Sequence, residues 1–159
     1  MTVAIIERAL ALGAAPSRIP PKTISRSSRR TCSATIRAGY ARVPAHALYI
    51  DPPLGRAGMT EVEVHQSRRR VLVGQRPMTR VARAVEKGET RGFRKVLVDR
   101  DTEGILGASI LGPGGDEVIH CVLDLTLAKA PYTVLQRTMH IYPTVLDLLP
   151  TILDALQPL

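Results

Sequence analysis

Three residues near the C-terminal end of the chain have side chains that can hold or move a proton. His140, Tyr142 and Asp147 place an imidazole, a phenol and a carboxylate within eight positions, and Pro143 follows the phenol. An imidazole titrates at about pH 6.5, whereas a phenol, with a pKa of about 10, is a poor general base at neutral pH. We therefore expect Tyr142 either to donate a hydrogen bond or bind a ligand, or to be an aromatic residue packed at an interface.

The histidines offer one alternative base. His140 precedes Tyr142 by two residues, so on an extended segment both side chains lie on the same face, and His140 could act in place of the phenol. His120 lies in the middle of a predicted helix and reads as a structural or surface residue. His46 and His65 have no acidic partner at a telling distance. No Ser/His/Asp triad can be argued from this pattern.

The cysteines and the N-terminal apolar stretch exclude several classes of site. Cys32 and Cys121 lie far apart and match no zinc or redox-pair spacing, so we predict no metal site. Two lone thiols suit a reducing compartment, and we expect a cytoplasmic protein. The stretch "VAIIERALALGAA" carries Glu7 and Arg8 and is too short to cross a bilayer. We predict no membrane segment.

The positive charge of the chain is concentrated in its first part. Of the net charge of +8, residues 1–45 carry eight basic residues and one acid, and the remainder holds fourteen basic residues and thirteen acids. The chain has no Trp and one Phe, which leaves little aromatic surface for stacking bases. The run "SRRR" at 67–70 is typical of a solvated turn or strand end. The composition argues against a nucleic-acid partner.

The sequence divides into two parts, one without regular periodicity and one that reads as a folded domain. Residues 1–41 contain proline pairs and Ser/Arg clusters without helical or strand periodicity, so we predict a disordered leader. From about residue 42 the chain reads as one domain. A strand is expected at 46–50, ended by Asp51-Pro52-Pro53, and a short helix after Thr60 as N-cap. Residues 69–78 have strand spacing, and 93–98 with 105–111 predict a hairpin around "DRDTEG".

Two helices are expected after the hairpin. Residues 113–130 place Val118, Val122 and Leu125, with Cys121 as a further candidate, on one face, which predicts an amphipathic helix covering the sheet. A last helix is expected over 145–156, with Thr144 as its cap and a kink at Pro150. The predicted fold class is α+β: an antiparallel sheet with helices packed on one face.

The order of these segments is similar to that of a known family. "YIDPPLGRAGMTEVE", "GETRGFRKVLVDRDTEGILGASILGPGGDEVIH" and "PTVLDLLPTIL" together resemble the C-terminal dimerisation domain of the pyridine nucleotide-disulfide oxidoreductases, in particular mercuric reductase-like and dihydrolipoamide dehydrogenase-like members. The resemblance covers about residues 42–159. It implies a domain that follows FAD- and nicotinamide-binding domains and pairs two subunits. No GxGxxG and no CxxxxC occurs in this sequence.

The resemblance also assigns roles to the residues of the last motif. In the family this motif reads His-Pro-Thr followed by Glu, with the His of one subunit acting as acid/base near the flavin and disulfide of the other, and the Glu orienting it. Here Tyr142 stands in the His position and Asp147 in the Glu position. Tyr142 and Pro143 are thereby expected to face the flavin of the partner subunit. FAD and NAD(P)H are implied for the intact enzyme, and neither is expected on this chain alone.

A shift of reading frame would account for the composition of the leader. Read one base off, Ala15 to Arg37 can encode "AFTHTS", one ambiguous residue and "DDFEIVAANLLRDDPR", which resembles the linker before this domain in the same family. The family's frame would resume near Ala41. The hypothesis is that residues 1–41 are an out-of-frame segment, which the nucleotide sequence can test.

Three functions remain open from the sequence. The favoured one is the dimerisation domain of an FAD-dependent oxidoreductase that uses NAD(P)H to reduce a disulfide, a metal ion or a similar acceptor, inactive without its nucleotide-binding domains. A second is a structural partner that pairs with a full-length flavoprotein subunit. A basic-tail nucleic-acid binder is the third and least supported.

Overall fold

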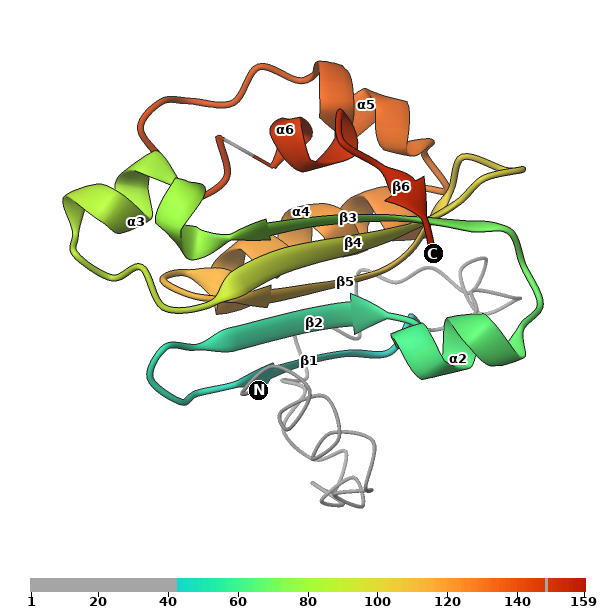
Figure 1. Cartoon of the computed structure of the whole chain (residues 1–159), viewed down its shortest axis with the longest axis horizontal. Helices are drawn as coiled ribbons and strands as arrows, with labels where there is room; N and C mark the ends of the chain where they lie inside the picture. The colour runs from blue at the N-terminus through green and yellow to red at the C-terminus, as the bar shows by residue number, and fades with distance from the viewer. Residues whose placement is uncertain (1–42, 148) are drawn as a thin grey trace, which may run out of the picture. The chain divides into compact units, whose positions relative to one another are not determined.

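One antiparallel sheet organises the structure, a computed structural model that describes residues 43–147 and 149–159 (Figure 1). In the described part of the chain its six strands are β1 (Ala45–Leu48), β2 (Leu54–Gly58), β3 (Val71–Pro77), β4 (Phe93–Asp99), β5 (Ile105–Leu111) and β6 (Gln157–Pro158). They lie side by side in the order β1-β2-β5-β4-β3-β6. The predicted leader and its proposed out-of-frame segment lie outside the described residues.

The helices are short, apart from one. They are α2 (Glu61–Gln66), the 3₁₀ turn η3 (Met78–Arg80), α3 (Ala82–Glu86), α4 (Gly115–Leu127), α5 (Tyr132–Arg137) and α6 (Pro150–Leu153). In Figure 1, α4 passes behind the strands at the centre of the sheet. The predicted α+β class, with its antiparallel sheet and packed helices, is confirmed.

The predicted hairpin between β4 and β5 is also confirmed. Phe93 lies opposite Leu111, and the pairing runs without interruption to a bulge at Leu97 and Val98. Alternate residues of β4 face opposite sides of the sheet because the side-chain period of a strand is two. Val96 and Val98 accordingly enter a large core, whereas Leu97 enters a small one.

The large core lies on the face of the sheet that α4, α5 and α6 cover. Ile119 and Val122 of α4, Leu135 of α5 and Ile152 of α6 are all buried there. Each such side chain contributes about 1.5–3 kcal/mol by leaving water. The apolar stripe of α4 is centred on Ile119 and Val122, while the predicted neighbours Val118, Cys121 and Leu125 pack at its margin.

The small core lies on the other face, under α2. Val64 is buried there against Val71 and Leu97. The helix begins as predicted at Thr60, whose hydroxyl accepts a hydrogen bond from Glu63 N–H while the Glu63 carboxylate accepts one from Thr60 N–H. This capping box satisfies two backbone donors that the first turn leaves without partners.

The prediction of a last helix over 145–156 was wrong. The helix α6 spans only Pro150–Leu153, and Pro150 starts it, because proline has no N–H to donate and fits the first helical turn. Thr144 does not cap it, since the Thr144 hydroxyl donates to the carbonyl of Ile141 at 2.7 Å. The carbonyl of Val145 accepts from the Arg94 side chain, so it is engaged by the sheet.

Differences at the first strands have a similar origin in tertiary contacts. The strand expected at 46–50 ends at Leu48, and Tyr49 and Ile50 are exposed beyond it. The segment Leu54–Gly58 was not predicted as a strand, and it contains two glycines, which have low strand propensity. It becomes β2 because it pairs with β1 on one side and β5 on the other.

Candidate functional site

The expected site residues lie on the segment 138–147, which follows α5. The segment leaves α5 at Thr138, whose hydroxyl donates to the carbonyl of Val134 at 2.7 Å. It contains a cis peptide bond between Tyr142 and Pro143. In Figure 1 it is the long orange stretch that leaves α5.

Tyr142 is presented to the outside of the domain. Its exposed fraction is 68%, and its neighbours Ile141 and Met139 are 81% and 96% exposed. Large apolar side chains at this exposure are uncommon on a free surface when they occur together, and they mark contact sites. The three residues Met139, Ile141 and Tyr142 are called the apolar run below.

Asp147 points the other way. Both of its carboxylate oxygens are buried and have no hydrogen-bond partner in the structure, so the Tyr142 hydroxyl is not bonded to them. The Nδ1 atom of His140 lies 3.4 Å from the carbonyl oxygen of Thr138. The structure thus places the three predicted residues on one segment but joins none of them by a hydrogen bond. An exposed phenol without a carboxylate partner is suited to donating a hydrogen bond rather than to accepting a proton.

The residue that sequence reasoning missed is Arg94. Its side chain is 0% exposed, and its Nη2 donates to the carbonyl of Val145. Burial lowers the pKa of Arg94 to about 10, an effect that the charge of Asp147 opposes and that of Arg76 increases. The signal in the sequence was periodicity: Arg94 shares the strand face of Val96 and Val98, which pointed into the core.

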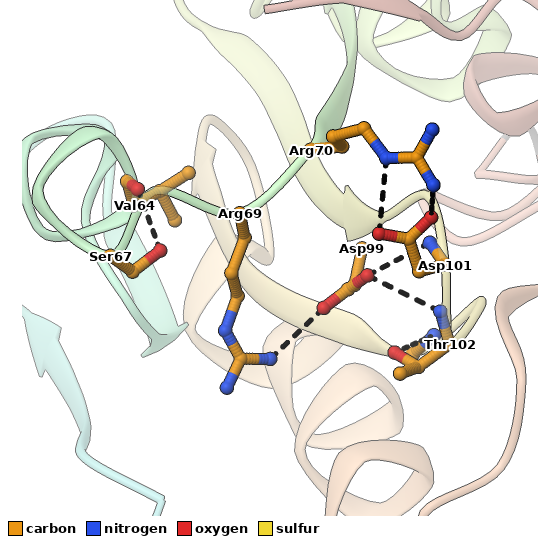
Figure 2. A network of polar contacts seen from close by, with 8 residues as sticks. Val64, Ser67, Arg69, Arg70, Asp99, Asp101 and Thr102 are labelled. Carbon is orange, nitrogen blue, oxygen red and sulfur yellow. Dashed lines mark hydrogen bonds and ion pairs between the residues drawn. The ribbon is translucent and has the colours of Figure 1, made fainter.

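A second polar network lies at the opposite end of β4 and is structural (Figure 2). The Asp99 carboxylate accepts from the N–H groups of Asp101 and Thr102 and from Arg69 Nη1 at 2.9 Å. The side chain of Arg70 pairs with Asp101. Two arginines of the "SRRR" run therefore hold the β4–β5 turn. Burial raises the pKa of Asp99, but these hydrogen bonds and the charge of Arg69 outweigh it, and the pKa is lowered.

Other titratable groups take structural positions. The pKa of His46 is lowered by burial and by the charge of Arg56, which lies opposite it on β2. His120 is exposed on α4. Residues 43–147 and 149–159 contain no group of three His, Cys, Asp or Glu side chains that could hold a metal ion. Over the same residues, no helix is long and apolar enough to cross a membrane.

Comparison with known proteins identifies the domain. The family described as "Pyridine nucleotide-disulphide oxidoreductase, dimerisation domain" matches residues 44–151. The chain is 33% identical over 99 residues to the probable pyridine nucleotide-disulfide oxidoreductase RclA of Escherichia coli (strain K12), covering 62% of this chain and 22% of that protein. It is 35% identical over 98 residues to the dihydrolipoyl dehydrogenase of Bacillus subtilis (strain 168), covering 61% and 20%.

Solved structures agree with the sequence match. The HOCl-induced flavoprotein disulfide reductase RclA from Escherichia coli superposes with a TM-score of 0.70 at 30% identity, over 72% of this chain and 26% of that one. LpdA from Mycobacterium tuberculosis, at 18% identity and a TM-score of 0.65 over 70% of this chain and 24% of that one, shares the fold. The chain spans about a fifth of the length of the curated relatives it matches. With its sheet, its helices and the order of its motifs, the chain belongs to the pyridine nucleotide-disulphide oxidoreductase family through that family's dimerisation domain.

Proposed function

We propose that this chain pairs subunits of an FAD-dependent oxidoreductase that uses NAD(P)H to reduce a disulfide, a metal ion or a similar acceptor. The match of residues 44–151 to the family's dimerisation domain carries the proposal. A relative named as a flavoprotein disulfide reductase, also solved as a Cu(II) complex, supports this range of acceptors. Without flavin- and nicotinamide-binding domains we expect the chain to be inactive, because the groups that move hydride belong to those cofactors.

The residues on the segment 138–147 are suited to forming one edge of a flavin site, and they do not make a complete site. Tyr142 and Pro143 are exposed, and the phenol is free to donate a hydrogen bond to a polar atom of a neighbouring group. The bound flavin supplies the redox chemistry. This chain would contribute contact, hydrogen bonding and exclusion of water at the subunit boundary, and we assign Tyr142 the role of a donor and not of a base.

The apolar run supplies a direct test of pairing. Sedimentation of the full chain is expected to give a dimer, because association would remove Met139, Ile141 and Tyr142 from water. Ile141→Glu should shift the equilibrium to monomer, since it places a charge in the contact. Val62→Glu is the matched control, as Val62 is 54% exposed on α2. A wild-type chain that stays monomeric, or equal effects of the two variants, would contradict homodimerisation.

The same run supports the second candidate, a partner for a full-length flavoprotein subunit. In that arrangement the chain alone is monomeric, and mixing it with an intact family flavoprotein gives a complex in which flavin absorbance and the chain sediment together. Ile141→Glu should prevent this complex as well. A chain that forms neither species rejects both arrangements. We place the protein in the cytoplasm on its lone thiols, and cell fractionation tests that assignment.

A further inference from the structure

Arg94 is a charged residue in an apolar position. It lies on the face of β4 that α4, α5 and α6 cover, directly opposite Ile110 on β5 and Arg76 on β3. Its exposed fraction of 0% makes it one of the largest fully buried side chains in the described part of the chain. A buried guanidinium is costly unless charge and hydrogen bonds offset its loss of water. The residues around Arg94 must supply that compensation.

The compensation comes from the segment that carries Tyr142. Arg94 Nη2 donates to the carbonyl of Val145, and Arg76 Nη2 donates to the carbonyl of Thr151 at 3.3 Å. The two cross-strand arginines thus hold the backbone on either side of Asp147 against the sheet. The acid whose charge acts on Arg94 is Asp147.

The unsatisfied atoms of Arg94 and Asp147 are complementary in number and kind. Arg94 retains two buried donors, Nε and Nη1, and Asp147 retains two buried acceptors, Oδ1 and Oδ2, all without a hydrogen-bond partner. An N–H···O bond between one of these donors and an Asp147 oxygen would satisfy one atom of each kind and pair the two charges. Nε–H and Nη1–H point to different sides of the guanidinium group, so a two-bond contact with a single carboxylate would have to include Nη2, which already donates to Val145. Asp147 lies two residues beyond the carbonyl that Arg94 holds.

We propose that Arg94 and Asp147 form a buried charge pair that anchors the segment 142–147 to β4, with Arg94 acting as a positioning residue for Tyr142. Asp147 serves the anchor and does not orient the phenol. The proposal deepens the proposed function and rests on it, because the anchor matters for function only where Tyr142 lies at the subunit boundary. The pair itself is a property of this chain and can be measured without flavin or partner.

Fluorine NMR of the full chain labelled with meta-fluorotyrosine tests the pair. The chain has four tyrosines, so the spectrum is simple, and Tyr142→Phe identifies the Tyr142 signal. Arg94→Met and Asp147→Asn are each expected to shift or broaden that signal, and the double variant to do no more than either alone, because both remove the same contact. Arg83→Met is the control, as Arg83 pairs on the surface with Glu86.

Three results would overturn the proposal. One is a Tyr142 signal that Arg94→Met moves no more than Arg83→Met does. Another is additive effects of Arg94→Met and Asp147→Asn. The third is a phenol titration that Asp147→Asn displaces in wild-type and Arg94→Met chains alike, which would mean that Asp147 contacts the phenol. If Arg94→Met does not fold, Arg94→Gln, which also removes the charge, serves instead, and an undiminished effect of Asp147→Asn in that background overturns the pair. A chain that forms neither a homodimer nor a complex with a family flavoprotein would reject the proposed function and leave these outcomes unaffected.

Discussion

Two buried carboxylates of this domain show how differently the same group can be used. Asp99 has its charge shared among two backbone N–H groups and Arg69, and it fixes a turn. Asp147 has both oxygens buried without a hydrogen bond, and its charge acts on Arg94 of β4. A satisfied carboxylate stabilises its own turn, whereas an unsatisfied one depends on how a distant residue is placed. The backbone contacts of Asp99 come from its own turn, whereas Asp147 depends on a residue from a distant part of the chain.

The role of Asp99 leads to a prediction about pH. Asp99→Asn should destabilise the domain by about 1–3 kcal/mol at neutral pH, because it removes the charge that Arg69 pairs with. The folded pKa of Asp99 is below its unfolded value, so this stability is complete above about pH 3.9 and disappears as the pH falls through the folded pKa. Urea unfolding of both proteins across acidic pH measures the difference.

Asp101→Asn is the control for this experiment. Asp101 pairs with Arg70 where both side chains are largely exposed, so the variant should lose less than about 1 kcal/mol. A difference between wild type and Asp99→Asn that stays constant down to the most acid conditions would show that the charge of Asp99 does not stabilise the fold.

The elements meet most closely where α4 crosses β2. A Cβ placed on Gly55 would lie 2.0 Å from the carbonyl oxygen of Gly115 and 2.9 Å from Cβ of Ile119. The backbone of the strand and the start of the helix can touch only because neither residue has a side chain. This contact sets how α4 covers the sheet.

Gly55→Ala should therefore weaken the packing of α4. The added methyl group collides with backbone, which cannot turn away, and we expect a loss of about 1–3 kcal/mol or more in the free energy of unfolding. Gly104→Ala is the matched control, since its Cβ would meet only the Thr102 hydroxyl, at 3.3 Å. Equal midpoints for the two variants in thermal unfolding would refute the close contact.

The capping box gives a prediction for α2. Thr60→Ala removes the hydroxyl that accepts from Glu63 N–H, and it should destabilise the domain by about 1 kcal/mol. Thr79→Ala, at an exposed position of η3, should change little. Hydrogen exchange of the α2 amides reports the same change locally, and protection that is unaltered in Thr60→Ala would argue against the cap.

At the scale of the whole molecule, the apolar run links stability to association. If the chain pairs through Met139, Ile141 and Tyr142, pairing stabilises the folded state by mass action, and the Tm should rise with protein concentration. Ile141→Glu should make the Tm independent of concentration. Calorimetry over a wide concentration range measures this, and a concentration-independent Tm for the wild type would contradict pairing.

The sequence by itself determined the features that depend on neighbours along the chain. Strand alternation and turn residues indicated the β4–β5 hairpin, helical spacing indicated α4, and Thr60 with Glu63 indicated the start of α2. Several motifs in a fixed order indicated the family, which the match over residues 44–151 confirms. The hairpin, the spacing of α4 and the start of α2 are short-range physical preferences that tertiary packing reinforced.

Only the tertiary structure decided the course of the segment around Tyr142 and the direction of Asp147. A helix over 145–156 was expected, with Thr144 as its cap, but the carbonyl of Val145 is taken by Arg94, a residue 51 positions away. The strand Leu54–Gly58 contains two glycines and forms between partners on both sides, β1 and β5. A hydrogen bond to a distant residue leaves no periodic trace in the segment that accepts it, and for that reason the structure was needed to find it.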